Sequence, residues 1–150
     1  MSQSLAKIYV HIVFSTKQRT RFIKPDIEKE LFAYMGSSIK LTDSIPVLIN
    51  GSEDHIHILA LLHKTISLSK MIEEVKKNSS RWIKTKNPIY RDFSWQRGYA
   101  AFSVGSSELE KVKEYILNQK EHHKKFNFQE ELITLLNKHE IEYDPHYIWD

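Results

Sequence analysis

The chain has 150 residues, of which 41% are apolar and 27% charged, and its formal net charge is +3. This composition is typical of a soluble globular protein and allows one domain with a sizeable core. Cysteine is absent, which excludes disulfides and cysteine-ligated zinc and fits a reducing cytoplasm. No apolar run is long enough to span a bilayer and the first residues lack a signal-peptide core, so we expect a cytoplasmic protein without membrane contact.

The first part of the sequence predicts a strand followed by a helix. Residues 7–15 alternate between two faces, which is typical of a strand with one side in a core. The face toward the core carries Ile8, Val10, Ile12 and Phe14, and the other face carries Tyr9, His11 and Val13. Pro25 and Asp26 begin a helical pattern that we expect to continue to about residue 39.

The next segments predict a hairpin and a second helix. Residues 45–49 and 55–62 have the character of strands, and the turn-forming residues 50–54 join them. Residues 67–84 have helical spacing with one apolar side. That side is formed by Leu68, Met71, Ile72, Val75, Trp82 and Ile83.

The last third of the sequence predicts a strand and then further helices. Residues 93–104 are rich in aromatic side chains and extended in character. Ser107 and Glu110 have the spacing of a capping box, which predicts a helix over about 107–123.

A second capping-box spacing, Asn127 with Glu130, predicts a final helix that ends near residue 138. The tail over residues 141–150 is aromatic, so we expect it to pack against the rest of the protein. We expect one domain over residues 1–150, with the C-terminal helix and tail over about 127–150.

These elements follow the order β-α-β-β-α-β, with helices after them. The order predicts an α+β fold: a ferredoxin-like (RRM-like) split β-α-β sandwich, with an antiparallel sheet, helices on one face and additional C-terminal helices. The first and third strands are central neighbours in that topology.

The third predicted strand carries two histidines with one residue between them. Residues two apart on a strand share a face, so His55 and His57 project side by side. Neutral imidazole is the commonest metal-ligating side chain, so the pair forms half of a metal site. Two imidazoles without partners fit poorly in a core, which favours the open face of the sheet. In a chain with eight histidines this spacing also arises by chance, so the pair alone allows a structural role.

The predicted helix over 107–123 carries a second candidate pair. Tyr115 and Gln119 are four residues apart and share one helix face. A carboxamide oxygen can ligate Mg²⁺, which keeps open positions for a substrate, and a tyrosine can form a covalent intermediate. The alternative is a half-buried helix tyrosine and a solvated amide.

Basic residues form two groups that could bind phosphates: Lys17, Arg19 and Arg21 before the first helix, and Lys70, Lys77, Arg81 and Lys84 on the second helix. A solvated helix face is an equally good explanation for any one of them. Asp54 could orient a neighbouring imidazole or could be an ordinary turn residue. For His122 and His123, stabilisation of a helix C-terminus is the simpler explanation than metal binding.

Five segments together resemble a known family. They are Asp54–His57, Tyr115–Gln119, Tyr9–Phe14, Trp95–Tyr99 and Asn78–Arg81. In this set and this order, which covers nearly the whole chain, they are similar to the single-tyrosine HUH transposases of the insertion sequence 200/605 group, also called the transposase IS200-like family. HUH denotes a histidine, a bulky apolar residue and a histidine, as in His55-Ile56-His57.

The resemblance implies an enzyme that nicks and rejoins single-stranded DNA. By analogy with the family, His55, His57 and Gln119 of this chain would hold one Mg²⁺ or Mn²⁺ ion, and Tyr115 would attack the scissile phosphate. The products would be a 5′-phosphotyrosine and a free 3′-hydroxyl. The resemblance also implies a homodimer, a hairpin-forming DNA end as partner, and in some members a tyrosine helix that serves the other subunit.

Two other functions fit parts of the sequence. One is a non-catalytic module that binds single-stranded nucleic acid on the sheet, although such modules carry aromatic pairs where this chain has histidines. The other is a metal-dependent nuclease with no covalent intermediate, in which Tyr115 is incidental.

Overall fold

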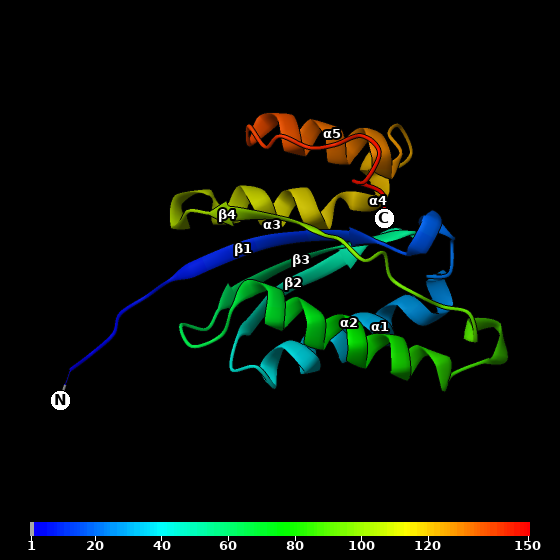
Figure 1. The fold of residues 1–150 in the computed structure, drawn as a ribbon, viewed down its shortest axis with the longest axis horizontal. Coiled ribbons are helices and arrows are strands. Elements are labelled where there is room, and N and C mark those ends of the chain that lie inside the picture. Colours follow the sequence, from blue (N-terminus) through cyan, green and yellow to red (C-terminus); the bar gives the residue numbers. More distant parts are fainter. Residues whose placement is uncertain (1) are drawn as a thin grey trace.

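Residues 2–150 are described by the computed structural model, which is built around one four-stranded sheet. Its strands are β1 (Ile8–Ser15), β2 (Ile45–Gly51), β3 (His55–Leu62) and β4 (Ala100–Val104). They pair antiparallel in the order β2-β3-β1-β4, so the first and third strands are the central neighbours, as predicted (Figure 1).

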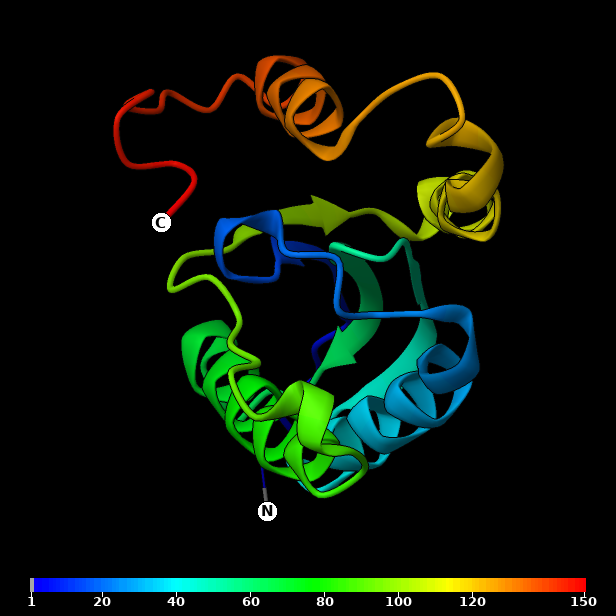
Figure 2. The same ribbon diagram turned by 90° about the vertical axis from the view of Figure 1, so that its right-hand side faces the viewer.

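Two helices cover one face of the sheet. The helix α1 (Pro25–Lys40) begins with proline in its first turn, where no amide donor is needed. The helix α2 (Leu68–Lys84) begins after Ser67, whose side chain accepts a hydrogen bond from the Lys70 amide. Both helices lie on the same side of the sheet (Figure 2). The α+β, ferredoxin-like architecture is therefore confirmed.

The main core fills the space between the sheet and these two helices. The alternation of β1 and β3 sends every second side chain into this core, including Ile12, Phe14, Ile56 and Ile58. The predicted apolar side of α2 meets them through Met71, Ile72, Val75 and Ile83. Burial of this apolar surface therefore places the alternate residues of each strand on the opposite face of the sheet.

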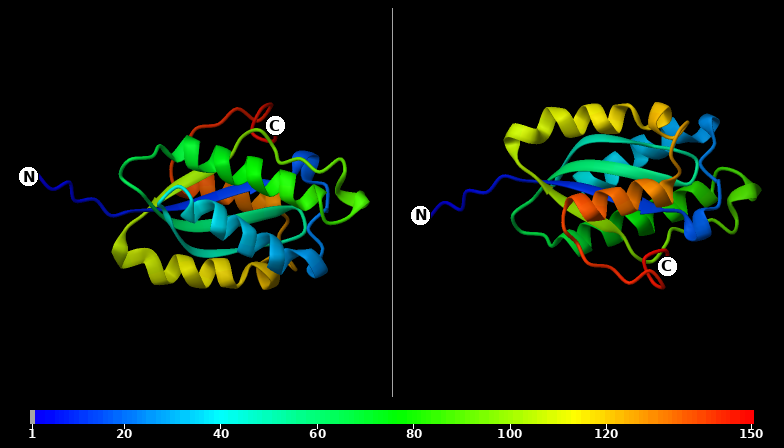
Figure 3. Two further views of the ribbon diagram at one scale, coloured as in Figure 1. Left: turned by 90° about the horizontal axis from the view of Figure 1, so that it is seen from below. Right: turned by 90° about the horizontal axis from the view of Figure 1, so that it is seen from above.

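The other face of the sheet is covered by the C-terminal helices. They are α3 (Leu109–Leu117), α4 (Gln119–His122) and α5 (Phe128–Lys138). The right-hand view of Figure 3 shows that α3 lies toward the β2 edge of this face and α5 over β1 and β4. A short 3-10 turn, η3 (Ser106–Glu108), leads into α3. The sheet thus has a helical layer on both faces.

The expected single helix over 107–123 is interrupted at Asn118. The backbone of Asn118 has φ −91° and ψ 15°, outside the helical region, so Tyr115 and Gln119 lie on two consecutive helices. The capping box expected at Ser107 is absent, whereas the one formed by Asn127 and Glu130 is present at the start of α5.

Two irregular segments complete the fold. The expected extended segment over residues 93–104 forms a strand only in β4, with a separate bridge between Thr16 and Trp95. The tail packs on the protein, as expected: the Gly98 amide donates to the Asp150 carbonyl, and Trp149 packs against the core cluster under α5. Within residues 2–150, no helix has the length and apolar character needed to cross a membrane.

Candidate metal and nucleophile site

The two histidines of β3 lie on the sheet face opposite α1 and α2. This is the face that the sequence favours, but it is not open. The C-terminal helices cover it, and both His55 and His57 are 0% exposed. Two buried imidazoles need hydrogen-bonding partners or a cation, so their surroundings decide their role.

A carboxylate from α5 lies at the centre of these surroundings. Glu131 Oε1 is 3.0 Å from His57 Nε2 and 3.3 Å from His55 Nε2. The same oxygen is 3.0 Å from Nε2 of His123, the residue directly after α4. The candidate ligand atoms of these four residues all lie within 4.8 Å of one another.

Gln119 joins this cluster from the first residue of α4. Its side chain is fully buried rather than solvated. Its Nε2 donates to Glu131 Oε2 at 2.9 Å, and its Oε1 is 2.9 Å from His123 Nε2 and 3.5 Å from His55 Nε2. The structure therefore brings together the three expected ligands His55, His57 and Gln119.

The donor set fits a divalent cation. Three imidazole nitrogens and one carboxylate converge with Gln119 beside them, and all come from buried or nearly buried side chains. Imidazole suits Zn²⁺ and Fe²⁺, whereas Mg²⁺ prefers oxygen ligands. The chemistry of the donors is thus that of a transition-metal site with a carboxylate to balance charge.

Each β3 histidine has a separate partner for its second ring nitrogen. The Asp54 Oδ1 atom is 2.7 Å from His55 Nδ1, and His11 Nε2 is 2.8 Å from His57 Nδ1. Such contacts fix the orientation of an imidazole so that its other nitrogen is presented to the cluster.

The proximity of these groups shifts their pKa values. Burial raises the pKa of Glu131, but hydrogen bonds from His123, His55 and His57 outweigh burial and hold the pKa well below its usual range. Burial lowers the pKa of His55, yet its contacts with Asp54 and Glu131 reverse the effect and raise that pKa. The cluster therefore combines an anionic carboxylate with a histidine that favours its charged form.

The candidate nucleophile lies beside the cluster in the same chain. Tyr115, on α3, donates a hydrogen bond from its hydroxyl to Glu131 Oε2. Its ring centroid is 5.8 Å from that of His57. Burial raises the pKa of Tyr115, and the negative charge of Glu131 raises it further. In this arrangement the tyrosine is held protonated.

A groove of about 740 Å³ leads from the surface to Tyr115. It lies between β4, α3 and α5, and its walls are mainly apolar, with Phe102, Val112, Phe126 and Leu135 among the lining residues. The groove therefore opens Tyr115 to the surface between α3 and α5.

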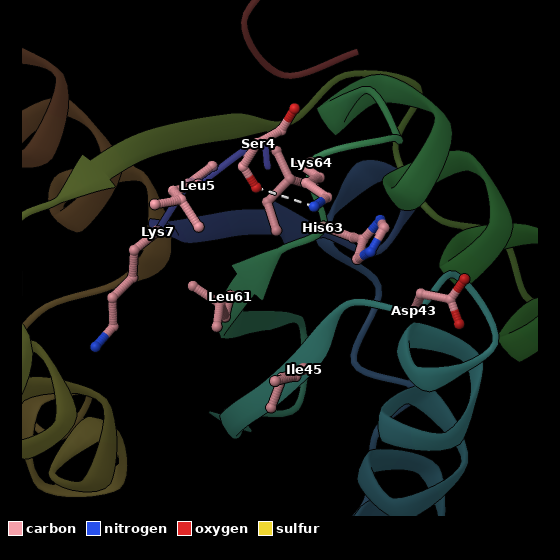
Figure 4. Close-up of a pocket in the computed structure, with 10 residues that line it drawn as sticks. Ser4, Leu5, Lys7, Asp43, Ile45, Leu61, His63 and Lys64 are labelled. Carbon is pink, nitrogen blue, oxygen red and sulfur yellow. Dashed lines mark hydrogen bonds between the residues drawn. The ribbon is translucent and has the colours of Figure 1, made fainter. Parts of the chain in front are cut away.

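A second hollow, of about 560 Å³, is lined by the N-terminal segment and by the ends of β2 and β3 (Figure 4). In it, Lys64 Nζ donates to the Ser4 carbonyl. None of the cluster residues lines this hollow.

The family profile described as "Transposase IS200 like" matches residues 4–119. The chain belongs to this transposase family. The matched range includes the histidine pair, Tyr115 and Gln119, but ends before His123 and Glu131. A search of curated proteins gave no match.

Two solved structures resemble this transposase. One is a candidate transposase from Deinococcus radiodurans R1, with TM-score 0.62 and 18% identity over 79% of this chain and 98% of the other. The other is a REP-associated tyrosine transposase bound to a REP hairpin, with TM-score 0.60 and 14% identity over 82% of this chain and 74% of the other. At these identities the likeness shows a shared fold.

The two groups of basic residues lie in different places. Lys17 and Arg19 form the 3-10 turn η1 (Lys17–Arg19), next to Thr16, whose amide donates to the Asp54 carbonyl beside the cluster. The side chains of Lys17 and Arg21 are exposed, and the Arg19 guanidinium lies 5.5 Å from the Trp149 ring centroid.

The second group lies on α2, across the sheet from the cluster. Lys70 pairs with Glu73 and Glu74, at 3.6 and 3.2 Å, and Lys77 pairs with Glu74 at 3.0 Å. Arg81 and Lys84, also on α2, are exposed. The structure does not bring the two groups together.

Sequence reasoning missed Glu131 and gave too little weight to His123. A signal for Glu131 was present: it occupies the apolar face of α5, at helical spacing with Phe128, Leu132 and Leu135. A carboxylate on the buried side of an amphipathic helix requires a partner. His11 carried a similar signal, because it lies on the same strand face as Tyr9 and Val13, away from the main core.

Proposed function

We propose that this transposase nicks and rejoins single-stranded DNA through a covalent bond to Tyr115, at a divalent-cation site built around His55 and His57. One observation carries the proposal: the Tyr115 hydroxyl and both histidines contact the same buried carboxylate, Glu131. A phosphate seated there would meet the nucleophile and the cation ligands at once.

The chemistry would be an exchange of one phosphodiester bond. The Tyr115 oxygen bonds to phosphorus, the bond from phosphorus to the 3′-oxygen breaks, and the 3′-oxygen takes up a proton to become a free hydroxyl. The phenolic proton is lost to solvent as the bond to phosphorus forms, and the hydrogen bond from Tyr115 to Glu131 holds the hydroxyl in place beforehand. Rejoining is the same exchange in reverse, with a 3′-hydroxyl as the nucleophile, so no nucleotide cofactor is consumed.

His55, His57, His123 and Glu131 would hold the cation, with the Gln119 oxygen as a further ligand. When bound, a divalent cation supplies positive charge that polarises the scissile phosphate and offsets the charge of Glu131. The residues of this chain hold the tyrosine in place until then: α3 positions Tyr115, and burial keeps it protonated. We expect Mn²⁺ to bind more tightly than Mg²⁺, because most of the donors are imidazoles.

The DNA partner is proposed from the structural neighbour that binds a REP hairpin. A hairpin with single-stranded flanks would place an unpaired segment in the groove beside Tyr115. Lys17 and Arg21, which are exposed after the end of β1 and do not line the groove, would contact DNA phosphates outside it. The homodimer remains a prediction. The cluster and Tyr115 come from one chain, so the proposed chemistry needs no side chain from a second subunit.

Incubation with hairpin oligonucleotides that carry randomised single-stranded flanks, in MnCl₂, tests the proposal. We expect a protein–DNA adduct that survives denaturation in detergent and is absent in Tyr115→Phe. The matched control Tyr143→Phe, at an exposed tail tyrosine, should form the adduct normally. Cleavage that persists in Tyr115→Phe would indicate a nuclease without a covalent intermediate. Binding without cleavage in either Mn²⁺ or Mg²⁺ would indicate a non-catalytic module.

A further inference from the structure

His57 is held between two different partners on its two ring nitrogens. Its Nε2 faces Glu131 Oε1 at 3.0 Å, inside the cluster. Its Nδ1 faces His11 Nε2 at 2.8 Å, on the side away from the cluster. Both histidines are buried, with 0% and 4% of their surfaces exposed, so neither contact is easily replaced by water.

The pairing of β1 with β3 creates this contact. In the strand register Val13 lies opposite His57 and His11 lies opposite Leu59, so His11 and His57 are diagonal neighbours on one face. Their rings stack, with centroids 5.1 Å apart and planes at 26°. The backbone therefore fixes the distance between the two imidazoles.

The two β3 histidines differ in the hydrogen-bonding capacity of the group that contacts their Nδ1 atom. The partner of His55 is the Asp54 carboxylate, which only accepts hydrogen bonds, so His55 Nδ1 carries a proton in every state. The partner of His57 is another imidazole. A neutral imidazole has one N–H and one lone pair, so His11 Nε2 can either donate or accept.

The direction of the His11–His57 hydrogen bond depends on what occupies the cluster. Without a cation, the His57 Nε2–H donates to Glu131, so His57 Nδ1 must accept from His11. With a cation on His57 Nε2, that nitrogen loses its proton to solvent and uses its lone pair for the cation. The proton between the two rings moves from His11 Nε2 to His57 Nδ1, and His11 takes up a proton on its own Nδ1, so both imidazoles stay neutral and His57 now donates to His11.

We propose that His11 is a positioning residue that presents His57 Nε2 to a divalent cation, and that the hydrogen bond between the two histidines reverses when the cation binds. The role rests on the proposed function only in requiring a cation in the cluster. An apolar residue at position 11 would leave the His57 Nδ1 proton buried without an acceptor whenever a cation is bound.

Binding of Mn²⁺ followed by electron paramagnetic resonance tests this role. We expect His11→Phe, which keeps a planar ring but no hydrogen-bonding nitrogen, to weaken Mn²⁺ binding by about ten-fold or more. His11→Gln, whose carboxamide can donate or accept at the same reach, should restore binding to within about three-fold of the unsubstituted protein. Tyr9→Phe, on the same strand face but outside the cluster, should bind Mn²⁺ normally.

The free energy of unfolding of each metal-free variant separates positioning from stability. A stable, folded His11→Phe protein with weakened Mn²⁺ binding supports the proposal. Equal weakening in His11→Phe and His11→Gln, or none in either, would overturn it.

Long-range ¹H–¹⁵N spectra of the unsubstituted protein test the reversal directly. We expect the His57 proton on Nε2 in the metal-free protein and on Nδ1 after addition of diamagnetic Zn²⁺. The same tautomer in both states would contradict the reversal. Neither measurement uses DNA, so loss of the Tyr115 adduct would reject the proposed chemistry alone. Failure of the unsubstituted protein to bind Mn²⁺ or Zn²⁺ would reject both the cation site and the role of His11.

Discussion

The hydroxyl of Tyr115 donates a hydrogen bond to Glu131, a carboxylate that also contacts His57. The proposed nucleophile and a proposed cation ligand are thereby joined through one side chain, which α5 supplies. Because the carboxylate is anionic and buried, it holds the tyrosine in its protonated form.

Replacement of the Glu131 carboxylate should change both the pKa of Tyr115 and the affinity of the cluster for Mn²⁺. In Glu131→Gln we expect the pKa of Tyr115 to fall relative to the unsubstituted protein, because a negative charge beside the phenol is removed. Mn²⁺ affinity should fall by about ten-fold or more, because an anionic ligand becomes neutral. Ultraviolet titration of tyrosine ionisation and Mn²⁺ binding measure the two effects. The matched control is Glu114→Gln, at an exposed residue of α3 next to Tyr115, and an equal effect there would contradict the prediction.

Cation binding should stabilise the folded protein. At about 100 times its dissociation constant, a ligand that binds only the native state adds about 3 kcal/mol to the free energy of unfolding. For a chain of this size that corresponds to a rise in Tm of roughly 5–10 °C. We expect MnCl₂ to raise Tm in the unsubstituted protein and EDTA to reverse the rise. His57→Ala should lose the response, whereas His146→Ala, at an exposed histidine, should keep it.

Most of the fold could be predicted from local pattern. The alternation of residues 7–15 and the hairpin at 45–62 specify strands whose apolar faces meet two amphipathic helices, and the structure has that arrangement. The cover over the second face could not be predicted in the same way. It depends on the path of the chain after Gly105 and on the interruption of the helix at Asn118, where the sequence has neither proline nor glycine.

The site was predictable only where local spacing along the chain reveals it. His55 and His57 follow from strand periodicity, and Tyr115 and Gln119 from their spacing and from the family resemblance. Glu131 comes from an element more than seventy residues after the pair, and only the three-dimensional fold brings it to them.

The turn before His55 should be intolerant of a side chain. A Cβ atom on Gly51 would lie 2.9 Å from Ile56 Cα and closer still to the His55 carbonyl oxygen. We expect Gly51→Ala to destabilise the protein by about 2 kcal/mol and to weaken Mn²⁺ binding by displacing His55. Gly36→Ala is the matched control, since its nearest neighbour would be 3.9 Å away and the residue lies within α1. That change should stabilise the protein by about 0.5–1 kcal/mol in urea unfolding.

Acid should destabilise the metal-free protein through His11. Burial, and then the nearby His57, lower the pKa of His11 from 6.5 to about 3. Between these values the unfolded chain binds a proton that the folded chain excludes, so stability falls as the pH falls below 6.5. At pH 5 this corresponds to about 2 kcal/mol.

Urea unfolding in EDTA at pH 7, 6 and 5 measures this dependence. In His11→Gln the group is absent, and the loss of stability between pH 7 and 5 should be smaller by up to that amount. His57, whose pKa burial lowers, contributes in the same direction as His11, and His55, whose pKa is raised, contributes in the opposite direction. Both are present in the two proteins, so the difference between the two pH profiles reports the removal of His11. Identical pH profiles would argue against this account.

The two groups of basic residues should differ in their effect on DNA binding. Lys17→Glu and Arg21→Glu lie near the cluster end of the sheet, so each should weaken binding to a single-stranded hairpin oligonucleotide and lower its salt dependence. Lys70→Glu and Lys77→Glu, which lose ion pairs across the sheet from the cluster, should leave binding within about three-fold. Fluorescence anisotropy over a range of NaCl concentrations measures both. A larger loss of DNA affinity in the two α2 variants would contradict the prediction and indicate that DNA binds on the α2 side of the sheet.

The alternation of β1 and β3 has a consequence for how this transposase tolerates mutation. Successive residues of each strand face different layers. Ile12, Ile56 and Ile58 lie in the main core, whereas His55 and His57 lie in the cluster and His11 contacts His57 from outside it. A saturation scan along β3 should therefore give variants of low abundance at Ile56 and Ile58, and variants that accumulate but are inert at His55 and His57. In such a gene, inactivity can evolve without loss of the folded protein, through a single change at the codon of His55 or His57.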